Sequence, residues 1–209
     1  MGNGIMGWHH DRTYLANPPV AVLLAASIVP EQGGDTWFAD MYRAYDTIPE
    51  SLLHKIKDLK LGPSSEPVAT YNQHMNFLSN TQQSARHPVI FTHPLSQRKV
   101  IFYGGGYVSR PNDVSTVGVK PCFVGMNQSD SDQLSEEIFE HIFQPEFIYR
   151  HHWKAGDITT FSHADVPHFT ANATYNPRVM TMITGVATDG TYEFLWKAKH
   201  SKTINIDEE

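Results

Sequence analysis

The stretch that decides the fold is Val20-Ala21-Val22-Leu23-Leu24-Ala25-Ala26-Ser27-Ile28-Val29, an apolar run enclosed by Pro19 and Pro30. Its length and β-branched ends are typical of a buried strand, although its periodicity alone also fits a helix. We therefore expect a buried strand here.

Helical periodicity follows this run. From Asp40 to Leu59 apolar residues recur at three- and four-residue steps, and Pro49 divides the segment into two short helices. A further helix is expected from about Asp130 to Phe143. Strand-like runs cover residues 100–103, 147–153, 158–161, 179–186 and 192–196. Strands surrounding a few helices favour a mainly β barrel or sandwich with flanking helices.

The bulk properties narrow the class of protein. The chain has 209 residues with 40% hydrophobic content, which suits a single domain over residues 1–209. A net charge of −6 disfavours nucleic acid and anionic membranes as partners. Cys122 is the only cysteine of the sequence, and no apolar run approaches the roughly 20 residues of a membrane helix. We expect a cytoplasmic protein without a membrane segment.

The segment 61–86 is polar, rich in Ser, Asn and Gln, and weakly periodic. Loops of this length in compact domains are usually functional lids or disordered, and both interpretations stay open. As an active-site lid it would bring Tyr71, Asn72 and His74 to a pocket. Ordinary loop or core packing explains these side chains equally well.

The motif Trp8-His9-His10-Asp11 precedes the expected buried strand. In a strand, His9 and Asp11 would point to one face and His10 to the other. An imidazole and a carboxylate on one face are potential metal ligands, but a lone His-x-Asp pair often occurs by chance. A facial triad for Fe(II) needs a second histidine from another strand of the sheet, for which His168 is a candidate.

Arg178 begins the apolar run 178–183. A buried guanidinium needs a partner, and a dicarboxylate ligand would supply one through a bidentate contact. A surface arginine at the end of a strand is the alternative.

The ordered set of motifs resembles the taurine/2,4-dichlorophenoxyacetate dioxygenase family, which depends on Fe(II) and 2-oxoglutarate. The resemblance spans nearly the whole chain and ends at His168 and Arg178. Its motifs are Trp8-His9-His10-Asp11, Pro18-Pro19, Gly33-Gly34-Asp35-Thr36, His87-Pro88-Val89, Thr92-His93-Pro94 and Trp153-Lys154-Ala155-Gly156-Asp157.

This resemblance implies a double-stranded β-helix (jelly roll) in which His9, Asp11 and His168 hold Fe(II). It implies that Thr36 and Arg178 hold the distal carboxylate of 2-oxoglutarate. The expected reaction consumes O2, releases succinate and CO2, and hydroxylates or oxidatively cleaves a small organic metabolite. A carboxylate at position 11, where related halogenases have Ala or Gly, favours hydroxylation.

The other histidines near these motifs have less specific interpretations. His151 and His152 are expected to be surface or packing residues. His163 is closer to the expected ligand, so a role in supporting the ligands or facing the substrate is weighed against an ordinary turn residue. His93 matches a family position and is expected beneath the site.

The sequence differs from the best-known relatives at a position that contacts the substrate in those proteins. Members that use sulfonates or aryloxyacetates have a second arginine four residues beyond the one matched by Arg178, whereas this sequence has Met182. The substrate is therefore either less anionic or held by Arg110 or Arg12. Tyr103 and Tyr107 are further candidates for the pocket.

The motif at His9 also lies unusually early, because family members carry several dozen residues before it. A fragment, a misassigned start and a natural short form all remain open. A missing strand would leave a sheet edge unpaired, which another copy or a partner chain would close. The alternative functions are a non-catalytic or partner-dependent jelly-roll subunit and, less favoured, a zinc hydrolase.

Overall fold

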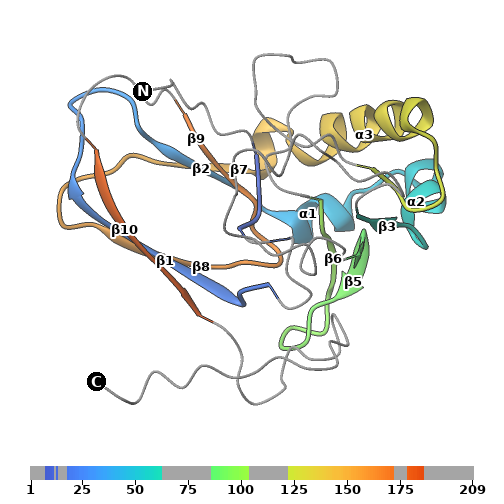
Figure 1. Ribbon diagram of the computed structural model, residues 1–209, viewed down its shortest axis with the longest axis horizontal. Coiled ribbons are helices and arrows are strands. Elements are labelled where there is room, and N and C mark those ends of the chain that lie inside the picture. Colours follow the sequence, from blue (N-terminus) through green and yellow to red (C-terminus); the bar gives the residue numbers. More distant parts are fainter. Residues whose placement is uncertain are drawn as a thin grey trace, which may run out of the picture.

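The computed structural model describes residues 8–11, 13, 18–62, 86–103, 122–171 and 178–185. Within these ranges the chain forms four antiparallel sheets and three α-helices. Figure 1 shows the two larger sheets on one side of the molecule and the helices on the other. The expected predominance of strands with a few flanking helices is confirmed.

Strand β1 (Ala21–Ile28) is the central strand of the first larger sheet. It pairs antiparallel with β10 (Val179–Gly185) and β8 (Ile158–Ser162). Val22, Leu24 and Ala26 are buried, whereas the residues that alternate with them are only partly buried. The expected strand is therefore confirmed, with one face turned towards the interior.

The second larger sheet is formed by β2 (Thr36–Ala39) between β7 (Ile148–His151) and β9 (His168–Thr170). Phe38 on β2 meets Phe161 on β8 with ring centroids 4.9 Å apart. The Phe161 ring also lies 5.1 Å from the ring of His168. The two sheets therefore pack face to face, with His168 on an inner face (Figure 1).

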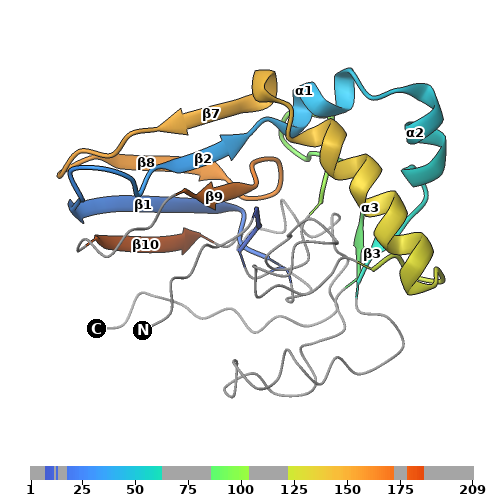
Figure 2. The ribbon, with the colours of Figure 1, turned by 90° about the horizontal axis from the view of Figure 1, so that it is seen from above.

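The helices gather at one end of these sheets (Figure 2). Helix α1 (Met41–Asp46) begins where the Asp40 carboxylate accepts hydrogen bonds from two backbone amides, and α2 (Glu50–Ile56) begins after Pro49. The two short helices expected on either side of this proline are confirmed. Helix α3 (Gln128–Ile142) begins earlier than the expected Asp130, because Asn127 caps its first turn.

Two small sheets of two strands each complete the described fold. They pair β3 (Lys60–Leu61) with β4 (His87–Pro88), and β5 (Ile90–Thr92) with β6 (Lys99–Ile101). Together with α1, α2 and α3 they enclose the larger apolar core, which includes Met41, Ile56, Val100, Phe102 and Ile138.

Several expectations lie on residues that the structure does not describe. Most of the candidate lid 61–86 lies outside the described ranges, as do residue 186 and the expected strand 192–196. Among the helices that are described, none is long and apolar enough to cross a membrane.

Candidate metal centre

His9 and His168 lie directly opposite each other in an isolated antiparallel bridge. The amide nitrogen of each donates to the carbonyl oxygen of the other, at 2.9 Å in both directions. Residues that exchange both hydrogen bonds carry their side chains on the same face, and the two imidazole centroids are 4.2 Å apart. Backbone pairing thus brings together two histidines from opposite ends of the chain.

The Asp11 carboxylate faces both imidazoles. Its Oδ1 lies 3.6 Å from Nε2 of His9, and its Oδ2 lies 3.7 Å from Nε2 of His168. One donor atom from each of the three residues lies within 4.8 Å of the others. In the part of the chain that the structure describes, this is the one group of three or more such side chains close enough to share an ion.

The local backbone differs from the strand expected for this motif. His9 forms only an isolated bridge, and Asp11 lies in a turn. His10 was expected to point away from His9 and Asp11, and this is confirmed. Its ring packs on Phe102 and does not face the Asp11 carboxylate. A turn rather than a strand therefore aims Asp11 back at His9.

Both imidazoles are buried, and burial favours the neutral form of His168. His9 is 3% exposed and His168 is 5% exposed. Burial, together with the neighbouring histidines, lowers the pKa of His168 well below its usual value. A neutral imidazole has a lone pair to offer a metal, and the donor set consists of two imidazole nitrogens and one carboxylate. These are ligands that suit iron and other first-row divalent metals.

Thr36 and Arg178 lie together between the sheets. Nη2 of Arg178 donates to Oγ1 of Thr36 at 3.2 Å, and the indole Nε1 of Trp153 donates to the same oxygen at 2.9 Å. With both acceptor positions used, the hydroxyl hydrogen of Thr36 is available for an acceptor group. Nε of Arg178 is buried without a hydrogen-bond partner among the described atoms. The pair thus presents an O–H and an N–H donor.

The carboxylate of Asp35 lies close enough to Arg178 to affect its pKa. The buried Asp35 carboxylate accepts from Nε of Arg150 at 2.7 Å and lies 3.2 Å from Nδ1 of His152. Burial lowers the pKa of Arg178, and Asp35 opposes that shift. Arginine remains charged under both influences, so Arg178 presents a positive charge.

Three buried histidines surround the ligand segment. Nε2 of His163 donates to the carbonyl oxygen of Asp11, and Nδ1 of His10 donates to the carbonyl oxygen of His163 at 2.5 Å. Nε2 of His87 donates to the carbonyl oxygen of Thr13 at 2.7 Å. Burial lowers the pKa of His163 to about 4. The sequence marked His163 as near the site, but the contacts of His10 and His87 carried no sequence signal.

Of the candidate substrate residues, Tyr103 and Met182 are described. Tyr103 is 1% exposed within the larger apolar core, and its hydroxyl donates to the Ser135 carbonyl oxygen at 3.1 Å, so it is a core residue and not a pocket residue. Met182 pairs with Leu24 across the β1–β10 ladder, so both side chains face the inner side of the sheet. Met182 is 48% exposed despite this orientation, which places it on an open part of the inner face. Tyr71, Asn72, Tyr107, Arg110, Arg12 and His74 lie outside the described residues.

The remaining histidines of interest lie apart from this group of donors. His151 contacts the Trp153 ring at 4.4 Å, and the His152 side chain is mostly exposed. His93 is buried with Nε2 4.0 Å from Asp165. None of the three belongs to the described metal-ligand group.

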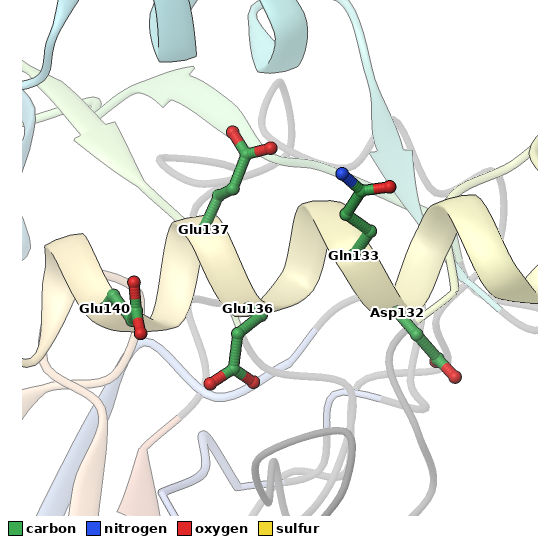
Figure 3. A pocket seen from close by; sticks show the side chains of 5 residues that line it. All are labelled: Asp132, Gln133, Glu136, Glu137 and Glu140. Atoms are coloured by element: carbon green, nitrogen blue, oxygen red, sulfur yellow. The ribbon is translucent and has the colours of Figure 1, made fainter.

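A hollow on α3 is unrelated to these donors. It is lined by Asp132, Gln133, Glu136, Glu137 and Glu140. Figure 3 shows these side chains leaving the helix in different directions. Glu137 already pairs with Lys55, whose Nζ lies 2.6 Å from Oε2. The carboxylates therefore do not converge as the Asp11 group does.

The comparisons with known proteins agree with one another. The family model for taurine catabolism dioxygenase TauD, TfdA family matches residues 1–180. An alpha-ketoglutarate-dependent 2,4-dichlorophenoxyacetate dioxygenase of Burkholderia sp. (strain RASC) is 32% identical over 171 residues, which cover 77% of this chain and 51% of that protein. An alkylsulfatase of Acinetobacter baylyi is 27% identical over 215 residues, covering 96% of this chain and 63% of that protein.

A solved structure is also similar. The crystal structure of AAD-2 in complex with Mn(II) and N-oxalylglycine matches with a TM-score of 0.69 and 25% identity, over 89% of this chain and 70% of that one. The chain spans 51% and 63% of the lengths of the two curated relatives described above.

Proposed function

Because the chain belongs to the TauD, TfdA family, we propose that it is an Fe(II)- and 2-oxoglutarate-dependent dioxygenase. It hydroxylates or oxidatively cleaves a small organic molecule and releases succinate and CO2. The single observation that carries this proposal is the convergence of His9, Asp11 and His168 within 4.8 Å.

The donor set fits the metal. Two neutral imidazoles and one carboxylate on one side of an ion form the facial triad of Fe(II) oxygenases, which leaves positions open for a cosubstrate and dioxygen. His9 and His168 present their Nε2 atoms, and Asp11 presents a carboxylate oxygen. The Mn(II) in the similar AAD-2 structure supports a divalent metal here.

Thr36 and Arg178 fit the cosubstrate. The distal carboxylate of 2-oxoglutarate would accept from the Thr36 hydroxyl and from the guanidinium of Arg178, whose Nε is buried without a described partner. Trp153 holds the Thr36 oxygen in place. The dioxygenase relative described as alpha-ketoglutarate-dependent supports the same choice of cosubstrate.

The chain's own residues orient the reaction. When bound, iron with 2-oxoglutarate and O2 supplies the oxidising power for attack on a C–H bond. His9 and His168 fix the direction of metal binding through their backbone bridge. Asp11 would bind the metal where related halogenases have Ala or Gly, which favours hydroxylation.

Met182 favours a substrate that is less anionic than a sulfonate. It lies on the inner face of β10, where it offers an apolar thioether and no charge. An anion beside position 182 would meet this thioether where family members with anionic substrates have an arginine. Tyr71, Asn72, Tyr107 and Arg110 remain candidates for further substrate contacts. Of these, Arg110 is the one that would hold a residual negative charge.

The two facing three-stranded sheets support a double-stranded β-helix as the full fold. Residues 1–209 would form one such domain, with segment 61–86 as its lid. We also propose that another copy of the chain, or a partner chain, closes the barrel. The lone, buried Cys122 supports a cytoplasmic location.

The test combines binding and turnover. Anaerobic addition of Fe(II) and 2-oxoglutarate should produce the charge-transfer absorption of a chelated keto acid, and calorimetry should detect 2-oxoglutarate binding only with metal present. Fe(II)-dependent succinate formation should follow on addition of O2. Metal-replete protein that binds no 2-oxoglutarate would overturn the proposal.

Two other outcomes separate the alternatives. Binding of metal and 2-oxoglutarate without succinate formation, until a partner chain is added, would favour a partner-dependent subunit. Hydrolytic activity that requires Zn(II) and ignores 2-oxoglutarate would favour a zinc hydrolase.

A further inference from the structure

We propose that His163 and His10 are positioning residues that hold the metal-ligand segment in place through two reciprocal side-chain-to-backbone hydrogen bonds. This inference rests on the proposed metal site. It predicts that metal affinity depends on an N–H donor at one particular ring nitrogen of each histidine.

The ligand segment needs support that a sheet does not provide. Among the described residues, His9 is joined to β9 by a single bridge. Two residues later Asp11 lies in a turn, 15% exposed at its side chain. A carboxylate in a turn rotates with its backbone, so a bond to the Asp11 carbonyl directly limits where the carboxylate points.

His163 supplies that bond. Its Nε2 donates to the Asp11 carbonyl oxygen, and its side chain is almost fully buried. Its own backbone nitrogen donates to the Val20 carbonyl oxygen at 3.1 Å. The imidazole therefore connects the Asp11 turn to the backbone that leads into β1.

His10 returns the contact. Its Nδ1 donates to the His163 carbonyl oxygen at 2.5 Å, and its ring stacks on Phe102 with centroids 4.7 Å apart. Each histidine thus donates to the backbone of the other's segment. The two segments that carry Asp11 and His168 are joined beside the donors as well as at the His9–His168 bridge.

The contacts assign the ring hydrogens. A carbonyl oxygen only accepts, so the hydrogen sits on Nε2 of His163 and on Nδ1 of His10. The opposite nitrogens, Nδ1 of His163 and Nε2 of His10, have no hydrogen-bond partner among the described atoms. This is the arrangement of two neutral rings that each use one donor.

The assignment gives two variant pairs that match in shape and differ in the donor. The amide nitrogen of Gln reaches the place of Nε2, so His163→Gln keeps the donor and His163→Met removes it. The amide nitrogen of Asn reaches the place of Nδ1, so His10→Asn keeps the donor and His10→Leu removes it.

The experiment measures Mn(II) affinity from the EPR signal of the free ion, on the full chain without 2-oxoglutarate. We expect His163→Met and His10→Leu to weaken affinity at least about tenfold, as lost support of a metal ligand does. His163→Gln and His10→Asn should stay within about threefold of the wild type. Equal affinities within each pair would overturn the inference.

A buried histidine elsewhere provides the matched control. Nε2 of His141 in α3 donates to the Ala44 carbonyl oxygen at 2.7 Å. His141→Met should lower the melting temperature relative to His141→Gln but leave Mn(II) affinity unchanged. If His141→Met weakens Mn(II) binding as much as His163→Met does, the effect is general loss of structure and the inference is wrong.

The wild type separates this inference from the proposed function. A wild-type chain that binds no Mn(II) contradicts the metal site itself. A wild type that binds Mn(II), with variants that bind equally well, contradicts only the positioning role. If His163→Met does not fold, the His10 pair decides.

Discussion

Asp11 is central to the proposed metal site, because its carboxylate faces both imidazole Nε2 atoms. We expect Asp11→Ala to weaken Mn(II) binding at least about tenfold, since even supporting partners of a ligand contribute that much. The measurement is Mn(II) titration with EPR detection, followed by a succinate assay with Fe(II).

The control for this prediction is Asp46→Ala. Asp46, the last residue of α1, also carries a carboxylate, but it forms an exposed ion pair with Arg98, and exposed pairs contribute little. Its variant should bind Mn(II) as the wild type does. Unchanged affinity in Asp11→Ala would remove this carboxylate from the metal site.

Arg178 offers a second prediction for a single residue. Arg178→Lys keeps the charge but removes the planar fork that a carboxylate accepts in a bidentate manner. We expect the dissociation constant for 2-oxoglutarate, measured by calorimetry with Mn(II) present, to rise about tenfold or more. Mn(II) affinity alone should not change.

The matched substitution is Arg98→Lys, at an exposed arginine that pairs with Asp46. It should leave both affinities unchanged. A wild-type 2-oxoglutarate affinity in Arg178→Lys would show that the cosubstrate lies elsewhere.

The sequence predicted some of these residues and not others. The His-x-Asp spacing and the family resemblance pointed to His9, Asp11 and His168, which the fold does bring together. The contacts that surround them depend on ring rotation and on backbone that is distant in sequence. No pattern in the chain therefore predicted that His10 donates to the His163 carbonyl oxygen.

At the scale of elements, the alternation of buried and partly buried side chains along β1 has a measurable consequence for stability. Leu24 is buried on its inner face, whereas Leu23 on the outer face is only partly buried. We expect Leu24→Ala to lower the free energy of unfolding by about 2–3 kcal/mol, from lost burial and the cavity left behind. Leu23→Ala should cost less than about 1 kcal/mol. Urea unfolding at equilibrium measures both.

Equal losses for the two leucines would mean that both faces of β1 are covered in solution. That result would point to a further layer on the sheet. It would leave the pairing of β1 with β8 and β10 intact, because backbone hydrogen bonds set that pairing.

The sequence predicted long elements better than short ones. The β1 run and the two helices around Pro49 were recognised from periodicity, which needs several residues to show. Periodicity did not reveal β2 or β9, because four and three residues give too little alternation, and a strand at His168 was expected only from the metal-ligand argument. These short strands nevertheless carry Thr36 and His168, so much of the site rests on elements without a strong pattern.

At the scale of the whole molecule, the proposed substrate site lies between the inner faces of the two sheets. We expect Met182→Arg to raise the ratio of kcat/KM for anionic over neutral substrates about tenfold, because it adds a cation on the inner face. A panel of matched carboxylates and amides, assayed by succinate formation, measures the ratio.

Thr181→Arg is the control, because Thr181 neighbours Met182 on the same strand and faces the outer side. It adds the same charge without entering the space between the sheets. If both variants shift the ratio alike, long-range attraction and not contact explains the change, and Met182 does not line the substrate site.

The bridge between His9 and His168 also makes metal loading visible in the exchange of backbone hydrogen for deuterium. Both amides are used in the bridge, each with a 2.9 Å bond, so their exchange requires the His9 segment to separate from β9. An ion held by both side chains opposes that separation. Added Mn(II) should therefore slow exchange in peptides containing His9 and His168 and leave the amides of α3 unaffected, as mass spectrometry can measure. Equal rates with and without the ion would mean that metal is not shared across the bridge.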